Sequence, residues 1–342
     1  MEYVNDEQEE PQQTPEEYLA ERKKSLRTKS WWAIGAGLFV VAAHLVLFAI
    51  VIFGAGEQSI VGWSDLLRSL FFILALMAIA GGIYGLREAN RMTLEDLIPS
   101  REAIEFASQF EFIKPYFSYF LVGAIAAVYI TQMVVDAEVR TAADELPASI
   151  ARAGLIKPAV VNGGEWWRLL TGATVHGSLI HIFFNGYALL GFGRLIEYFS
   201  NRAHLAIVML LSIIAGSLAS TYFMPLTPTV GASGGIMGLI GFLAIYGSRR
   251  RRQLMPGFLK AMLTNIAFIA AFGLIAFSII DNFAHFGGLA VGVIYGLIAV
   301  PKDLDRNPRE VPQAVTILGY AAIAIFAAAC VFSMLLMKGT IG

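Results

Sequence analysis

Long apolar stretches recur along almost the whole chain and are separated by short polar segments. An α-helix rises 1.5 Å per residue, so about 20 apolar residues cross the roughly 30 Å hydrocarbon core of a bilayer. The pattern predicts about nine such spans, near residues 31–54, 66–86, 116–135, 178–199, 203–223, 231–248, 261–280, 282–300 and 313–337. We therefore expect an all-α, polytopic membrane protein.

The composition supports this class and excludes others. Of 342 residues, 57% are hydrophobic and only 15% are charged, which is far from the balance of soluble domains. The net charge is −1 and no long basic stripe alternates with aromatic residues, so we expect no nucleic-acid partner. The single cysteine, Cys330, lies in the last span, which excludes an intramolecular disulfide and a cysteine-based metal site.

Basic residues at the ends of spans predict the orientation of the chain, because such residues favour the cytoplasmic side. Three basic groups fall on one side if nine spans begin inside: residues 22–29, 249–252 and 302–309. We expect a cytoplasmic N-terminus, an extracytoplasmic C-terminus and a location in a bacterial inner membrane. The run of four arginines at 249–252 is interpreted as an orientation signal that contacts lipid headgroups, not as a binding site.

The same pattern divides the chain into five parts. An acidic and then basic tail is expected to be cytoplasmic and disordered, and it precedes a two-span extension, a cytoplasmic interfacial linker, a core, and a final loop with one more span. Their ranges are 1–30, 31–90, 91–115, 116–300 and 301–342.

Two connections look like more than simple links. Residues 100–114 mix Phe, Ile and Glu, which suits a helix lying on the inner membrane surface, although a solvated linker fits equally well. Residues 136–177 form an extracytoplasmic stretch that is too long for a turn. We expect it to fold on or partly in the outer leaflet.

Polar side chains inside apolar spans are costly and therefore indicate candidate functional sites. Asn185, Ser233 and His285 each lie 16 or 17 residues before the basic residue that flanks the span, namely Arg202, Arg249 and Lys302. At 1.5 Å per residue, each sits roughly 24–26 Å from the inner boundary and a few ångströms below the outer surface. His181 lies four residues before Asn185, on the same helix face. These groups are therefore predicted to meet at one depth.

Each group alone has an ordinary structural interpretation. A serine among glycines in a membrane helix usually serves packing or bonds to its own backbone. The pair His181 and Asn185 could join helices by polar contacts, and His285 could be a buried hydrogen-bonding residue. At a common depth, however, these groups form a hydrolytic set.

The chemistry of that set is acyl transfer. Ser233 is a candidate nucleophile that His285 activates as general base, and His285 would then protonate the leaving amine. The amide of Asn185, the imidazole of His181 and the N–H of Ser233 are candidate donors to the oxyanion. Glycines 231, 234 and 235 let the backbone approach a substrate closely, and the helix N-terminus at Ser233 favours an anion.

No third member of a catalytic triad is evident. Asp281 lies four residues before His285 and could orient it, but an acidic residue at the start of a helix is normally an N-cap. A dyad is therefore expected. His44 and His204 match no motif and are interpreted as structural.

Three motifs resemble the rhomboid family of intramembrane serine proteases. EWWRLLTGATVHGSLIHIFFN, residues 165–185, is similar to the Glu-x-Trp-Arg loop and the two-histidine and Asn motif of that family. GASG at 231–234 resembles its nucleophile motif, and AHFGGLAVG at 284–292 resembles its base-bearing helix. The resemblance covers roughly residues 116–300.

This resemblance implies a role for each matching residue. Ser233 and His285 would be the dyad, and His181 and Asn185 would assist the oxyanion. Structural roles would fall to residues that brace the outer loop or shape the site, and Trp167 would anchor at the interface. The structural residues are Glu165, Arg168, His176, Gly231, Gly234, Met237 and Gly288. The implied substrate is a transmembrane protein cut in or near its membrane segment within the lipid bilayer, with no cofactor and no metal.

The chain also departs from the family pattern. Two spans precede the six-helix core and one follows it; the last is a known kind of addition, whereas the first two could hold a substrate or partner or only anchor the chain. Met237 stands one turn after Ser233, where many members carry an aromatic residue against the imidazole. A methionine can also pack on a ring edge.

Three functions are therefore weighed. The intact dyad favours an active serine endopeptidase over a catalytically silent rhomboid-like protein that binds or escorts membrane clients. A transporter would fit nine spans with glycine-interrupted helices, but no internal repeat is visible and the polar residues gather near the outer edge, not at the midplane. The sequence does not specify the oligomeric state.

Overall fold

The computed structural model describes residues 14–55, 69–110, 113–139, 146–277 and 280–341. Regular structure in these segments is helical, apart from one isolated antiparallel bridge between Leu155 and Thr229. The chain divides into two compact units, Met1–Pro99 and Ser100–Gly342, and each is described by itself. The predicted all-α membrane fold is confirmed.

Eight helices among the described residues are long and apolar enough to cross a membrane. They are α1 (Pro15–Ala55), α3 (Leu70–Arg91), α5 (Tyr116–Glu138), α9 (Leu179–Phe199), α10 (Arg202–Phe223), α12 (Phe258–Ile275), α13 (Asn282–Ala299) and α14 (Gln313–Met337). The ninth predicted span is α11 (Ser233–Arg249), a helix of only 17 residues. It packs against α9, α10, α12 and α13, so protein covers most of its surface and a full lipid-facing length is not needed.

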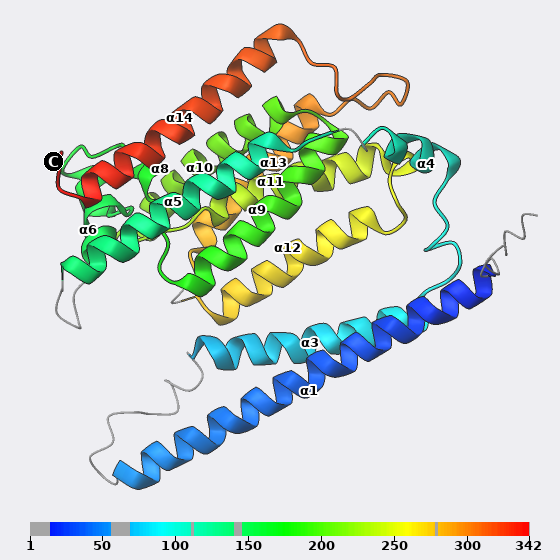
Figure 1. The fold of residues 1–342 in the computed structure, drawn as a ribbon, viewed down its shortest axis with the longest axis horizontal. Helices are drawn as coiled ribbons and strands as arrows, with labels where there is room; N and C mark the ends of the chain where they lie inside the picture. Colours follow the sequence, from blue (N-terminus) through cyan, green and yellow to red (C-terminus); the bar gives the residue numbers. More distant parts are fainter. Residues whose placement is uncertain (1–13, 56–68, 111–112, 140–145, 278–279, 342) are drawn as a thin grey trace, which may run out of the picture. The chain divides into compact units, whose positions relative to one another are not determined.

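The first unit is a hairpin in which α1 and α3 lie side by side (Figure 1). Small residues allow this approach: a Cβ atom at Gly37 would lie 2.6 Å from the carbonyl oxygen of Ala75. A hydrogen bond of 2.8 Å joins His44 Nε2 to Ser69 Oγ, just before α3 begins. His44 thus makes the kind of structural contact that was expected of it.

The expectation of a disordered tail fails for residues 15–30, which form the first part of α1. Thr14 and Glu17 explain the start of this helix through a reciprocal capping box. The N–H of Thr14 donates to Glu17 Oε2 over 2.8 Å, and the N–H of Glu17 donates to Thr14 Oγ1 over 3.2 Å. Pro15 at the first helical position has no N–H to satisfy. Residues 1–13, for which disorder was also expected, lie outside the described residues.

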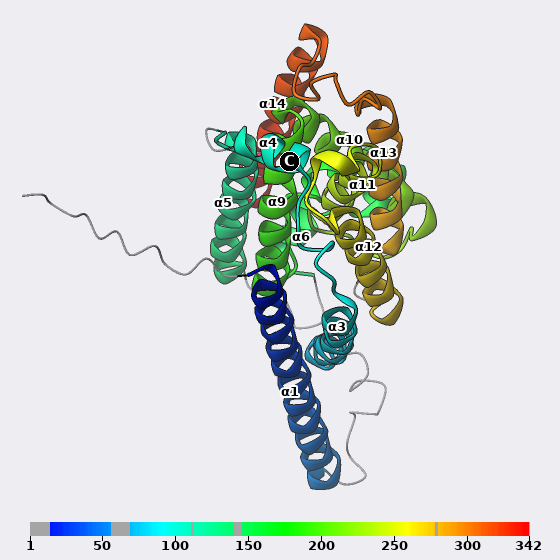
Figure 2. The same ribbon diagram turned by 90° about the vertical axis from the view of Figure 1, so that its right-hand side faces the viewer.

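The second unit is built around α11. Every residue from Gly234 to Ala244 is buried, and Figure 2 shows α11 among α9, α10, α12 and α13. The predicted six-helix core corresponds to α5, α9, α10, α11, α12 and α13. His204 on α10 lies inside this core, where its Nδ1 is 2.8 Å from the hydroxyl of Tyr295 on α13. This contact fits the structural role expected of His204.

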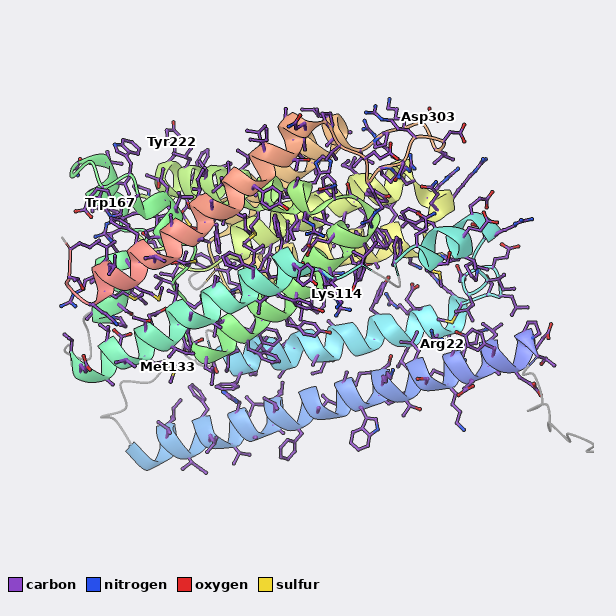
Figure 3. The ribbon with its side chains drawn as sticks, turned by 45° about the horizontal axis from the view of Figure 1, so that its top comes forward. Arg22, Lys114, Met133, Trp167, Tyr222 and Asp303 are labelled. Carbon is purple, nitrogen blue, oxygen red and sulfur yellow. The ribbon has the colours of Figure 1, made fainter. Side chains whose placement is uncertain are left out.

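The basic residues that flank the spans lie at one end of this unit. Arg250, which is fully buried, donates to the carbonyl oxygens of Asp303, Leu304 and Arg306. Arg309 donates to the carbonyl of Tyr198 at the end of α9. Figure 3 shows Asp303 at this end and Trp167 at the other.

Both unusual connections contain helix. Arg101–Ser108 forms α4, where Ser100 caps the first turn and its hydroxyl donates to the carbonyl of Arg252 over 2.7 Å. α4 therefore packs against the 3-10 turn Arg251–Gln253. The second connection, residues 136–177, is named the outer stretch after its expected side, and its described part holds three short helices, α6 (Ala148–Ala153), α7 (Lys157–Val161) and α8 (Arg168–Thr171).

α14 packs along α10 and α5 and also reaches the outer stretch. A Cβ atom at Gly319 would lie 2.4 Å from the Cα atom of Ala203, so the two backbones nearly touch. Near the other end, the hydroxyls of Ser333 and Thr174 are 2.8 Å apart and buried. Cys330 is buried between these points, 3% exposed. We therefore expect its thiol to react with a probe when α14 separates from the core.

Gly292→Ala is expected to destabilise the second unit by about 1–3 kcal/mol or more, the usual cost of overpacking. A Cβ atom there would lie 1.9 Å from the carbonyl oxygen of Gly238, and backbone cannot move aside as a side chain can. Thermal unfolding in detergent, followed with a fluorogenic thiol probe for Cys330, measures the change.

Gly191→Ala is the matched control, because a Cβ atom there meets no atom within 4 Å. It should unfold like the wild type or at a slightly higher temperature, since Ala is the better helix former. Equal unfolding temperatures for both variants would contradict this account of the packing between α11 and α13.

Candidate active site

Ser233 is the first residue of α11, and a turn at Gly231 brings the chain to it. Gly231 has φ +114°, a value that side-chain-bearing residues rarely adopt, and its N–H donates to the carbonyl of Gly172 over 2.9 Å. Ala232 next to it is fully buried, whereas Ser233 is half-buried. The hydroxyl is therefore presented at the beginning of a helix, where backbone N–H groups lack intrahelical partners.

His285 faces this hydroxyl from the first turn of α13. Its Nε2 lies 2.8 Å from Ser233 Oγ, a hydrogen-bond distance. The two predicted dyad residues, 52 positions apart in the sequence, are thus in direct contact. This is the central observation on the site.

Glycines allow that contact. A Cβ atom at Gly288 would lie 1.9 Å from the carbonyl oxygen of Gly234, so α11 and α13 meet through their backbones one turn beyond the two side chains. A Cβ atom at Gly234 would lie 3.2 Å from the carbonyl oxygen of Ala284. Any larger residue at Gly288 would push Ser233 and His285 apart.

α9 contributes the two other predicted polar residues. His181 lies against the turn before α11, since a Cβ atom at Gly231 would be 2.7 Å from its Cε1 and Nε2. Asn185, 5% exposed, would be 3.7 Å from the same Cβ atom, and its Nδ2 donates to the carbonyl of His181 over 3.0 Å. Both side chains therefore adjoin the segment that carries Ser233.

His176 lies in the loop before α9 and contacts both α5 and His181. Its N–H and carbonyl both bond to the amide of Gln132 on α5 at 2.9 Å, and its ring lies edge-on to that of His181 with centroids 5.1 Å apart. Burial, with a smaller contribution from nearby His181, lowers the pKa of His176 to about 3. A neutral, buried ring suits the structural role that was expected.

The predicted pair of Glu165 and Arg168 forms in the outer stretch. Arg168 Nε donates to Glu165 Oε2 over 2.5 Å, and Nη1 donates to the carbonyls of Ala151 and Gly154. This guanidinium therefore ties α6 to α8. Trp167 beside it is 40% exposed and packs edge-on to Phe332 of α14.

Met237, one turn after Ser233, is 4% exposed and belongs to the main hydrophobic cluster.

Asp281 caps α13, as its position at a helix start predicts, because its Oδ1 accepts from the N–H of Ala284 over 2.9 Å. Its Oδ2 accepts from the hydroxyl of Thr229 over 2.6 Å. His285 Nδ1 has no hydrogen-bond partner among the described residues, so no described hydrogen bond joins Asp281 to the imidazole.

Two residues near the site were missed from the sequence. Gln132 is a polar side chain inside an apolar span, a signal that would have been sufficient to single it out. Lys157, 1% exposed, lies in the irregular outer stretch, where no periodicity predicts which residues turn inward.

Comparisons with known proteins identify relatives of this chain. A family model described as the Rhomboid domain matches residues 163–302. "Rhomboid-like protease 1" of Toxoplasma gondii is 30% identical over 247 residues, covering 67% of this chain and 80% of that protein. The chain belongs to the rhomboid family. "Putative rhomboid protease YdcA" of Bacillus subtilis is 32% identical over 147 residues, 43% of this chain and 73% of that protein.

Other rhomboid proteins are longer than the shared region. "Rhomboid protease GluP" of Bacillus subtilis is 32% identical over 189 residues, which cover 54% of this chain but only 35% of that protein. The chain thus spans about a third of the length of this relative. The region matched by the family model, residues 163–302, contains α9, α10, α12 and α13, which are all long and apolar enough to cross a membrane. The chain is therefore a multi-pass membrane protein.

Gly231→Ala is expected to lower the stability of the second unit by at least about 1–2 kcal/mol, the cost of a positive φ at a non-glycine residue. The clash of the new methyl group with the His181 ring adds to this cost. Unfolding monitored through Cys330 measures the change.

Gly177→Ala is the control, because a Cβ atom there would meet nothing closer than 3.8 Å and no positive φ is required. It should unfold like the wild type. If the Gly231 variant did so too, the backbone constraint described for this turn would be incorrect.

Proposed function

We propose that this rhomboid protein is an intramembrane serine endopeptidase that hydrolyses peptide bonds in or near transmembrane segments of membrane proteins. The observation that carries the proposal is the 2.8 Å contact between Ser233 Oγ and His285 Nε2. Protease-named relatives support the reaction class. Ser233 and His285 are the proposed catalytic dyad.

The mechanism follows from the two side chains. His285 Nε2 accepts the proton of Ser233 as Oγ attacks the substrate carbonyl, and a tetrahedral intermediate forms. His285 then donates that proton to the leaving amine, the C–N bond breaks, and an acyl group remains on Ser233. A water molecule, deprotonated by His285, hydrolyses this ester and restores both residues.

The negative charge on the intermediate needs donors that are already in position. The N–H of Ser233 at the start of α11, Asn185 Nδ2 and the ring of His181 are the proposed donors. Asn185 and His181 adjoin the turn at Gly231 from α9. Their proximity to the reacting serine supports this assignment.

The proposed substrates are transmembrane proteins whose helix can unwind, because a hydrogen-bonded helical peptide cannot present its carbonyl carbon to Ser233. Residues that weaken a helix would favour cleavage. Water must also reach the dyad, so we propose that the site is open to the outer aqueous phase.

The proposed orientation puts the N-terminus in the cytoplasm and the C-terminus outside. It is supported by the basic residues that gather at one end of the second unit, opposite Trp167 (Figure 3). A bacterial inner membrane as the location is part of the same proposal.

Ser233→Ala and His285→Ala are each expected to reduce cleavage of a reporter transmembrane protein to background, since each removes one half of the proton transfer. Cleavage in liposomes and labelling of Ser233 by a fluorophosphonate probe are the measurements. Ser108→Ala and His44→Ala are the controls, because the hydrogen bonds of Ser108 and His44 go to Glu105 and Ser69, and both should retain wild-type activity.

Full cleavage by either dyad variant would reject the assignment. A folded wild-type protein that resists the fluorophosphonate and binds the reporter without cutting it would instead support the alternative, a catalytically silent rhomboid-like protein that binds or escorts membrane clients.

Asn185→Ala should lower kcat by about 10²–10³-fold, the usual effect of removing one oxyanion donor, with a smaller change in KM. Asn265→Ala is a matched control, because Asn265 Nδ2 makes the same bond to the carbonyl four residues earlier in its own helix. It should leave kcat unchanged. Equal kcat values for the two variants would exclude Asn185 from the oxyanion site.

A further inference from the structure

Four polar side chains cluster beside the Ser233–His285 pair, and the proposed mechanism uses none of them. Lys157 Nζ donates to Thr229 Oγ1 over 2.6 Å and also to the carbonyl of Thr227. The Thr229 hydroxyl in turn donates to Asp281 Oδ2, and Ser220 donates to the same oxygen. Lys157 Nζ itself lies 3.8 Å from that oxygen. The donors and acceptors of this outer cluster are therefore mutually satisfied.

The four residues come from four separate segments. Lys157 belongs to α7 of the outer stretch, Ser220 to the end of α10, Thr229 to the segment before α11, and Asp281 to the N-cap of α13. The backbone supports the same junction, because Leu155 and Thr229 exchange two hydrogen bonds of 3.0 and 3.1 Å. The outer cluster thus joins the outer stretch to the starts of both helices of the dyad.

Two members of the outer cluster stand close to the reacting groups along the chain. Thr229 is four residues before Ser233, and Asp281 is four residues before His285. Asp281 controls the first turn of α13 twice: its Oδ1 accepts from the N–H of Ala284, and its carbonyl accepts from the N–H of His285. A shift of the outer cluster would therefore move both side chains of the dyad.

Lys157 is an unexpected residue at this position, since a lysine is almost never fully buried unless it is paired. It is 1% exposed. Burial lowers the pKa of Lys157 to about 8, and the opposing charge of Asp281 limits the decrease. An ion pair and four hydrogen bonds therefore fix the junction, and these polar contacts constrain direction more strongly than apolar packing does.

We propose that Lys157 and Asp281 are positioning residues for the dyad, which hold the starts of α11 and α13 at the separation that keeps Ser233 Oγ and His285 Nε2 in hydrogen-bond contact. This inference rests on the proposed function. A misplacement of about 1 Å from a distant change can cost about 10²-fold in rate, so small shifts of this junction matter. Neither residue touches the substrate in this proposal.

The test uses Lys157→Met and Asp281→Asn in the full-length protein, reconstituted with the reporter transmembrane protein. Lys157→Met keeps the length of the side chain and removes the donors. Asp281→Asn keeps an oxygen that can accept from Ala284, so the helix cap survives while the charge is lost. We expect each variant to lose about 10–100-fold in kcat with KM nearly unchanged.

The double variant distinguishes coupling from separate effects. The effects of two substitutions that act through one junction are not additive. The kcat of the double variant should therefore be at most about 2-fold below that of the slower single variant. Arg152→Met is the matched control: Arg152 is another basic residue of the outer stretch, but it donates to the carbonyl of Met337 in α14. Its kcat should equal that of the wild type.

Unfolding followed through Cys330 separates positioning from stability. A loss of activity that matches the loss of folded protein would overturn the proposal in favour of a merely structural role. Wild-type kcat in both single variants, beside an active wild type, would also overturn it. If the wild type itself does not cleave while Ser233 stays unlabelled by the fluorophosphonate, the proposed function fails and this inference fails with it.

Discussion

The site depends on backbone contact between two helices that carry no side chain at the point where they meet. Gly288 and Gly292 of α13 lie against the carbonyl oxygens of Gly234 and Gly238 of α11, with no room for a methyl group. Lipid supplies no hydrophobic force between apolar helices, so this close packing is what holds them together. The same approach leaves the side chains one turn earlier, Ser233 and His285, 2.8 Å apart.

Most of the membrane fold could be predicted because hydrophobic length is a strong signal. The predicted spans 178–199, 203–223 and 282–300 differ from α9, α10 and α13 by one residue at most at either end. The predicted depths of Ser233, His285 and Asn185 also brought these residues to neighbouring positions, since a helix converts residue counts directly into distance. Lipid-facing and buried spans, however, have similar compositions. The sequence therefore predicted α11 as a span like the others, although other helices surround it.

Other parts could not be predicted, for two different reasons. The segment 15–30 was expected to be disordered from its charge, but the reciprocal bonds of Thr14 and Glu17 start a helix there, and local capping chemistry outweighed composition. Lys157 was missed because an irregular segment has no period that would tell an inward residue from an outward one. Gln132, by contrast, was detectable as a polar residue in an apolar helix, and its amide clamps the backbone of His176.

Three sets of polar contacts fix the connection between α5 and α9. Gln132 joins α5 to the backbone of His176, and Lys157 with Asp281 joins α7 to the start of α13. Arg168, paired with Glu165, joins α8 to α6 within the same stretch. Irregular backbone at membrane depth is tolerated only where protein or a water-filled cavity satisfies its polar groups. The starts of α11 and α13, which carry Ser233 and His285, have backbone N–H groups without helical partners. Side-chain bonds such as those of Asp281 take the place of the missing helical bonds, so specific polar contacts hold the ends of the two helices that carry the site.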